Sequence, residues 1–209
     1  RSIRVTDRGW EYEADQRHAD IIIKELGLQE AKGVSSPGEE EKLWKAEEDA
    51  ERLKGGDEKR SRALAARANY LAIDRSDIQY SVKEICKGMA QPNRGDIRKL
   101  RRLGRYLIER GRVVTSFDYQ GKHKEMKGFS DSDWAGCRRT AKSTSGGSIM
   151  IGKHWIKSWS STQKNITLSS GEAELVAAVK MATEMIGVCQ LANDWGEDSE
   201  GQVLSLIHI

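Results

Sequence analysis

Apolar residues recur every three or four positions through most of the first 110 residues, which is the spacing of amphipathic helices. These stripes predict helices over about 16–28, 59–73, 76–89 and 96–110. A short hairpin over residues 2–16 precedes them, with its turn at Asp7-Arg-Gly9. The Glu- and Lys-rich stretch that runs to about Arg52 is either a polar helix or a flexible insertion, and Gly55-Gly56 ends it.

After residue 112 the pattern changes to the short alternating runs of β-strands. Strands are predicted over 113–119, 126–133, 147–151, 154–160 and 203–209, with a turn over 136–147. A long helix begins after Ser169, because Ser169-x-x-Glu172 has the form of a capping box. Its expected buried stripe is Leu175, Ala178, Ala182, Met185, Cys189 and Ala192. Strands, a long helix and a further strand predict a layered α/β or α+β fold.

The composition is that of a highly charged soluble protein. The 209 residues, 37% hydrophobic and 32% charged, suffice for one large domain or two small ones. We find no run of about 18 apolar residues and expect no membrane span. The first residues carry neither an initiator Met nor a signal peptide, so we expect a fragment that begins inside a domain. Cys86, Cys137 and Cys189 show no metal-ligand spacing, which favours a reducing compartment and argues against structural zinc.

The net charge of +3 conceals a local asymmetry. Seven acids lie within 39–51, and eight Arg and Lys residues lie within 94–113. In the second segment Asp96 is a plausible N-cap, and Ile97, Leu100, Leu103 and Leu107 form an apolar stripe. The other faces of that helix carry Arg98, Lys99, Arg101, Arg102 and Arg105. A helix of this kind follows nucleic-acid phosphates or is simply a solvated surface, and the pattern leaves both open.

Acidic residues gather on two later elements. Asp131 and Asp133 alternate along a strand, and Glu174 lies on the long helix at the edge of its buried stripe. Clustered carboxylates stay ionised together when cations lie between them, and oxygen-only ligands suit Mg²⁺ or Mn²⁺. The alternative is that the two aspartates are turn acids and that the helix dipole favours Glu174. Spacing alone does not decide between these interpretations.

The hairpin loop beside Asp131 is a second candidate contact surface. Arg138, Arg139, Ser143 and Thr144 lie in it, either as ordinary turn residues or as contacts to the phosphates of a bound strand. The neighbouring Trp134 is expected in the core, with base stacking as the alternative.

Four motifs in the second half carry a family resemblance. They read Phe129-Ser-Asp-Ser-Asp-Trp-Ala-Gly136, Arg138-Arg-Thr-Ala-Lys-Ser-Thr-Ser-Gly-Gly147, Ile156-Lys-Ser-Trp-Ser-Ser-Thr-Gln163 and Leu168-Ser-Ser-Gly-Glu-Ala-Glu174. In order and spacing they resemble the ribonuclease H domain of copia-type LTR-retrotransposon Pol polyproteins. Upstream, 70–80 and 102–107 resemble the segment that joins reverse transcriptase to ribonuclease H. The resemblance runs from about residue 10 to 203.

The resemblance implies a fold and a domain division. It implies a ribonuclease H-like mixed sheet with a packed long helix over 111–209, incomplete at its C-terminus. Residues 1–110 would be the C-terminal part of reverse transcriptase: palm edge, thumb and connection. The polymerase aspartates would lie upstream, so no polymerase activity is expected.

The resemblance also implies a two-metal-ion hydrolase for the RNA strand of RNA–DNA hybrids, using Mg²⁺ or Mn²⁺. Asp131 and Glu174 match the first two of the family's four carboxylates, as catalytic residues and metal ligands. The third should follow the strand from Val203, where this chain has no acid, and residues 204–209 depart abruptly from the pattern. We therefore expect no activity from this chain alone.

The expected partners are an RNA–DNA hybrid and the rest of the polyprotein, namely the palm and fingers of reverse transcriptase and the integrase, with no membrane. The expected location is the cytoplasm, in virus-like particles, with nuclear entry possible. One alternative is a non-catalytic connection module that holds nucleic acid, with Asp131 and Glu174 as remnants. An integrase-like core is a weaker alternative, because nothing supplies a zinc-binding N-terminal module.

Overall fold

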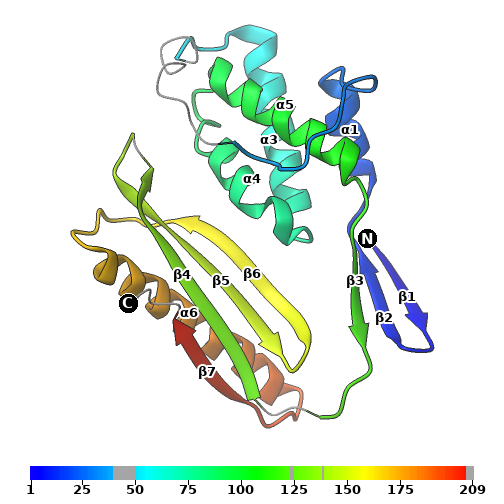
Figure 1. The fold of residues 1–209 in the computed structure, drawn as a ribbon, viewed down its shortest axis with the longest axis vertical. Coiled ribbons are helices and arrows are strands. Elements are labelled where there is room, and N and C mark those ends of the chain that lie inside the picture. The colour runs from blue at the N-terminus through cyan, green and yellow to red at the C-terminus, as the bar shows by residue number, and fades with distance from the viewer. Residues whose placement is uncertain (40–49, 123–124, 138, 206–209) are drawn as a thin grey trace. The chain divides into compact units, whose positions relative to one another are not determined.

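The computed structural model describes residues 1–39, 50–122, 125–137 and 139–205. Within it the chain divides into two compact units, Arg1–Ser116 and Phe117–Ile209, whereas the boundary predicted from the sequence lies at residue 110. The Glu- and Lys-rich stretch predicted as a polar helix or an insertion falls largely on 40–49, outside the described residues. Figure 1 shows the elements of each unit.

The first unit opens with the predicted hairpin. Strands β1 (Ser2–Thr6) and β2 (Gly9–Glu13) pair antiparallel, with Ser2 opposite Glu13 and Thr6 opposite Gly9. Strand β3 (Val114–Asp118) joins them in a sheet of order β1-β2-β3. The hairpin prediction is therefore confirmed.

Helices form the rest of the first unit. They are α1 (Arg17–Glu25), α3 (Gly55–Ala72), the short 3₁₀ helix η2 (Ser76–Ile78) with α4 (Gln79–Cys86), and α5 (Arg94–Glu109). Each buries one apolar face in a common core, whose fully buried members include Ile22, Ala68, Ile78, Val82, Leu100 and Leu103. The predicted stripe of α5 is confirmed for Leu100, Leu103 and Leu107, which are buried, and Ile97 is half-buried against the same core. Its N-cap is Asn93 rather than Asp96: the two residues form a capping box, each side chain accepting a hydrogen bond from the other's backbone N–H at 3.0 Å.

A buried arginine joins the start of α4 to the end of α5. Arg75, 2% exposed, donates to both carboxylate oxygens of Asp77 at 2.8 and 2.7 Å. It also donates to the carbonyls of Gly111 and Arg110 at 3.0 and 2.8 Å. Burial opposes ionisation of Asp77, but the hydrogen bonds from Arg75 and Tyr106 outweigh it and hold the pKa of that carboxyl below its usual value.

The second unit is a mixed sheet with one long helix packed on it. Its elements are β4 (Glu125–Cys137), β5 (Lys142–Ile151), β6 (His154–Thr162), α6 (Ser170–Asp194) and β7 (Glu200–Ser205). The sheet order is β6-β5-β4-β7, with β4 antiparallel to β5 and parallel to β7. This arrangement confirms the predicted fold class and is compatible with a ribonuclease H-like fold. Three boundaries are wrong: β4 ends at Cys137 and β5 begins at Lys142, both inside the predicted turn over 136–147, and β7 begins at Glu200 rather than at Val203.

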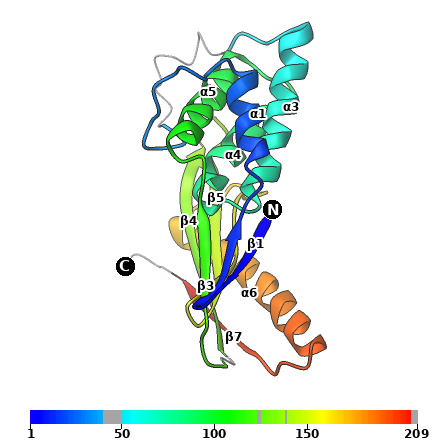
Figure 2. The same ribbon diagram turned by 90° about the vertical axis from the view of Figure 1, so that its right-hand side faces the viewer.

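Helix α6 lies on one face of this sheet (Figure 2) and approaches it closely where the strands carry glycine. A Cβ at Gly128 would lie 2.6 Å from Met181 Sδ, and one at Gly201 would lie 2.5 Å from Met185 Cγ. The expected buried stripe of α6 is wrong in its first turns. Ala173, Ala177, Met181 and Met185 face the sheet, while Leu175 is 63% exposed. Met181 and Met185 occupy the space that the glycines leave, and Leu175, Val176 and Val179 lie on the exposed face.

Helix α6 is also long and apolar enough to cross a membrane, judged by length and composition. Its most apolar 18-residue window has a mean hydropathy of 1.5, and 17% of that window is buried. Charged and polar residues interrupt the apolar positions of this helix, which is why the sequence predicted no membrane span. One such helix is weak evidence for a membrane span, because a core helix of a soluble protein passes the same test.

Replacing Arg75 by Met should lower the free energy of unfolding of the first unit by about 3 kcal/mol, because removing one partner of a buried ion pair leaves the other uncompensated. Urea unfolding followed by far-ultraviolet circular dichroism measures this. Arg62→Met is the matched control, since Arg62 also contacts one acid and two carbonyls, Glu58, Met89 and Ala90, but its side chain is 45% exposed. We expect it to cost less than about 1 kcal/mol. Equal effects of the two substitutions would contradict the structural role of Arg75.

Candidate functional site

Asp131 and Glu174, the two acids singled out from the sequence, meet at one backbone amide. The N–H of Ser132 donates to Asp131 Oδ1 at 2.9 Å and to Glu174 Oε1 at 3.1 Å. The two carboxylate oxygens therefore lie within hydrogen-bonding distance of the same nitrogen atom. The structure thus brings the two residues together from β4 and α6.

The side chain of Ser132 adds a second link. Its hydroxyl donates to the same Glu174 Oε1 at 2.9 Å, so that oxygen accepts two hydrogen bonds from one residue. The other oxygen, Glu174 Oε2, is buried and has no hydrogen-bond partner among the described residues. Asp131 is exposed. The pair thus presents one exposed carboxylate and one buried acceptor atom without a protein donor, which suits a cation ligand.

The N-terminus of α6 is fixed by its cap. Ser169 Oγ accepts a hydrogen bond from the N–H of Glu172 at 3.1 Å, as the capping-box prediction requires. The reciprocal contact differs from the prediction, since the Glu172 carboxylate accepts from the N–H of Leu168 at 2.6 Å. Glu172 is thereby occupied in holding the turn, and Glu174 is the acid that contacts β4, through Ser132.

Gln163 ties the end of β6 to this helix, a role that no sequence pattern predicts. The side chain is 5% exposed, and its amide nitrogen donates to Ser145 Oγ at 2.9 Å and to the carbonyl of Ala173 at 2.8 Å. Ala173 directly precedes Glu174. Gln163 therefore sets the distance between the first turn of α6 and β5, and with it the position of Glu174.

The predicted contact residues Ser143 and Thr144 are buried, with 0% and 6% exposure. Ser143 Oγ accepts a hydrogen bond from the N–H of Ala135 at 3.1 Å and shares one with Thr167 Oγ1 at 2.9 Å. Ser143 thereby holds the irregular end of β4, where the register with β5 shifts between Asp133 and Cys137. Trp134, expected in the core, is 49% exposed and donates through Nε1 to the carbonyl of Thr167 at 3.2 Å.

The remaining acidic and basic residues of this loop make no contact with Asp131 or Glu174 that the structure describes. Asp133 is exposed, and its carboxylate lies so close to Gly136 that a Cβ would not fit there. Arg139 is exposed at the turn between β4 and β5, and Arg138 lies outside the described residues. Within 1–39, 50–122, 125–137 and 139–205, no three His, Cys, Asp or Glu side chains form a group that could hold a metal ion. The site described here has two carboxylates.

The basic residues of α5 divide into two sets. Arg102 donates to the carbonyl and hydroxyl oxygens of Ser36 at 3.1 and 3.0 Å, and Arg105 donates to the carbonyl of Lys32 at 2.7 Å. These two arginines hold the 32–39 segment against the helix. Arg98 lies 3.9 Å from Glu39, Lys99 is half-buried, and Arg101 is exposed and has no ion pair or hydrogen bond with any described residue.

Comparison with known proteins gives several relatives, although no family model and no solved structure matches the chain. The uncharacterized mitochondrial protein AtMg00810 of Arabidopsis thaliana is 30% identical over 171 residues, which cover 81% of this chain and 68% of that protein. The retrovirus-related Pol polyprotein from transposon RE1 of the same plant is 34% identical over 65% of this chain. The corresponding polyprotein from transposon TNT 1-94 of Nicotiana tabacum is 25% identical over 88% of it. The chain spans 9% and 14% of these two polyproteins.

Replacing Gln163 by Ala should destabilise the second unit by about 1–3 kcal/mol, because the Ala173 carbonyl and the Ser145 hydroxyl lose a buried donor. Urea unfolding followed by tryptophan fluorescence reports on this unit through Trp134 and Trp159. Gln190→Ala is the control: Gln190 is exposed on α6 and donates only to Asp194, at 2.9 Å. It should change stability by less than about 0.5 kcal/mol. An equally small effect at Gln163 would argue against its role in positioning the helix.

Proposed function

The chain belongs to the family of copia-type retrotransposon Pol polyproteins and of the mitochondrial protein AtMg00810, and we propose that its second unit is a ribonuclease H-like domain. The first unit would then be the C-terminal part of the reverse transcriptase. The substrate of the intact protein is the RNA strand of an RNA–DNA hybrid. The mixed sheet order β6-β5-β4-β7 with α6 packed on it supports this assignment.

The observation that carries the proposal is the shared Ser132 amide. A strand residue and a helix residue, separated by more than forty positions, place their carboxylates at one N–H group. Two acids this close repel one another when both are ionised, unless a cation compensates them. The contact supports a cation-binding site, because it brings acids from two separate elements to one point.

Asp131 and Glu174 would hold Mg²⁺ or Mn²⁺, since oxygen ligands at an open site suit these ions. Such ions activate water and stabilise the leaving oxygen of a phosphodiester when bound. Ser132 fixes the Glu174 carboxylate through its amide and hydroxyl, which leaves Oε2 as the acceptor directed away from those donors. The exposed ring of Trp134 supplies a surface beside the site on which a sugar or base can pack.

A second candidate function is a connection-like module that holds nucleic acid without cleaving it. It is favoured by the number of acids, because the described residues offer two carboxylates at this site and no third. Under this candidate, Asp131 and Glu174 bind no cation. Cation binding therefore separates the two candidates without requiring a complete hydrolase.

The chain should bind Mn²⁺ at one site formed by Asp131 and Glu174, as measured by titration calorimetry. Asp131→Asn and Glu174→Gln should each weaken this binding by about tenfold or more, which corresponds to about 1.4 kcal/mol. The control is Glu172→Gln, which removes an acid two residues from Glu174 whose carboxylate already accepts from the N–H of Leu168. Binding that is unaffected by both site substitutions would refute the cation site and leave the connection module.

The chain alone should not cleave a hybrid at a measurable rate, because two carboxylates leave the second ion of a two-metal mechanism without its ligands. The assay follows shortening of a labelled RNA strand annealed to DNA, in Mg²⁺ and in Mn²⁺. The wild-type chain should be indistinguishable from its Asp131→Asn variant. Cleavage that Asp131→Asn abolishes would overturn this prediction and would show that the two acids suffice.

A further inference from the structure

Three sulfur atoms converge where helix α6 packs on strands β4 and β7. The thiol of Cys189 donates a weak hydrogen bond to Met126 Sδ at a sulfur–sulfur distance of 3.8 Å. Met126 lies opposite Gly201 in the register of β4 with β7. A Cβ on Gly201 would lie 3.1 Å from Met185 Sδ and 3.2 Å from Cys189 Sγ. One thiol and two thioethers therefore face the same point above Gly201.

The spacing of residues on the helix and the glycine beneath it produce this arrangement. Met185 and Cys189 are four positions apart, so their side chains are neighbours on one face of α6. Gly201 has no side chain, and a carbon atom added there would lie closer to both sulfur atoms than an ordinary van der Waals contact. The glycine thus lets the two sulfur atoms of the helix approach the strands at the position of Met126.

The surroundings of the three sulfur atoms are apolar. Met126 and Met185 are each 3% exposed and belong to one core cluster with the fully buried Ile149. Cys189 packs against this core but is only half-buried, so a ligand can reach the cluster from the side of the thiol. Thiolate and thioether ligands select soft ions such as Cu(I), whereas Mg²⁺ and Mn²⁺ prefer oxygen.

We propose that Met126, Met185 and Cys189 form a binding site for Cu(I). With metal–sulfur bonds of about 2.3 Å, the length found in zinc thiolates, the sulfur atoms of a trigonal site lie about 4 Å apart. The distance of 3.8 Å between Cys189 Sγ and Met126 Sδ fits this geometry. On binding, the thiol releases its proton to solvent and its sulfur forms a bond to the metal, with no change of oxidation state. A thiolate with a monovalent cation is neutral, which limits the cost of burying the charge.

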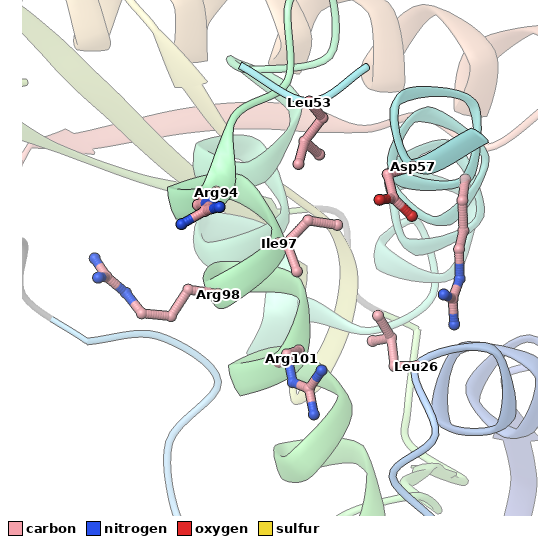
Figure 3. Close-up of a pocket in the computed structure, with 8 residues that line it drawn as sticks. Leu26, Leu53, Asp57, Arg94, Ile97, Arg98 and Arg101 are labelled. Carbon is pink, nitrogen blue, oxygen red and sulfur yellow. The ribbon is translucent and has the colours of Figure 1, made fainter. Parts of the chain in front are cut away.

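The two cavities that lie along α5 in the first unit offer a cation no comparable place. The first, of about 420 Å³, has Arg94, Arg98 and Arg101 among its lining residues (Figure 3). The second, of about 350 Å³, is lined by Lys32 and four arginines of α5. Each has one acid in its lining. Guanidinium groups are positively charged and donate hydrogen bonds without accepting them, so both cavities disfavour a cation.

The sulfur site is independent of the proposed site at Asp131 and Glu174, because the two share no residue and take ions of different kinds. Asp131→Asn should therefore leave Cu(I) binding unchanged. Cys189→Ser should likewise leave Mn²⁺ binding unchanged. Failure of either proposal leaves the other intact.

The test is competition for Cu(I), supplied as its acetonitrile complex, between the whole chain and the chromogenic chelator bicinchoninate, without oxygen and with ascorbate as reductant. We expect the chain to withdraw one equivalent of Cu(I) from the chelator. Cys189→Ser, Met126→Leu and Met185→Leu should each weaken binding by at least about tenfold, the effect of losing even an outer partner of a metal ligand. Leucine nearly conserves the volume of methionine, and circular dichroism checks that each variant is folded.

Met181→Leu is the matched control. Met181 is buried in the same core, but it lies eight positions before Cys189, about 12 Å along the helix axis, and should leave the affinity unchanged. Cys86→Ser and Cys137→Ser remove the two thiols outside the cluster and should also have no effect.

Two outcomes would overturn the proposal. If Cys189→Ser weakens binding but Met126→Leu and Met185→Leu do not, Cys189 is a single reactive thiol and the methionines are only core residues. If Met181→Leu or Cys137→Ser weakens binding as much as the cluster variants do, Cu(I) binds to sulfur in this chain without a defined site.

Discussion

The candidate site of the second unit is organised around one bifurcated hydrogen bond, from the Ser132 amide to Asp131 and Glu174. One N–H donor shared between two carboxylate oxygens satisfies the hydrogen-bonding capacity of each only in part. The Ser132 hydroxyl adds a donor for Glu174, but Oε2 of that residue stays buried without a partner. A buried polar atom in this state is costly, and folding tolerates such an atom where it serves a ligand.

That contact exists because the helix lies low on the sheet. Gly128 on β4 and Gly201 on β7 leave room for Met181 and Met185, and Gln163 holds the first turn of α6 by the carbonyl of Ala173. A larger residue at either glycine would lift the helix, and Glu174 would no longer reach the Ser132 amide. The position of the site is thus set by glycines on two neighbouring strands, where side chains are absent, and by the buried amide of Gln163. The same constraint decides which face of α6 is apolar and exposed, because only small residues and methionines fit beneath it.

The sequence predicted the helices of the first unit, the order of strands and helix in the second, and the approach of Asp131 to Glu174. It did not predict which face of α6 is buried, since Ala, Val, Leu and Met occur all round that helix and periodicity then has no clear direction. It also placed Ser143 and Thr144 in a turn. Hydroxyl-rich segments read as loops, and here their oxygens are satisfied by one another and by the backbone inside the sheet. The role of Gln163 depends on contacts that join the end of β6 to β5 and α6, and no local sequence pattern indicates such contacts.

The basic residues of α5 also show what sequence alone does not predict. Eight basic residues in 94–113 indicate a polyanion-facing surface, yet the run itself does not distinguish an arginine that holds a loop from one that faces solvent. Arg102 and Arg105 close the 32–39 segment onto the helix, and that closure forms one wall of the second cavity. Arg102 and Arg105 therefore shape this hollow, whereas Arg101 is exposed and makes no ion pair or hydrogen bond with any described residue. The basic residues of α5 are thus of two kinds, those that hold the 32–39 segment and those that face solvent. Their contacts with backbone carbonyls, which the sequence does not indicate, distinguish the two kinds.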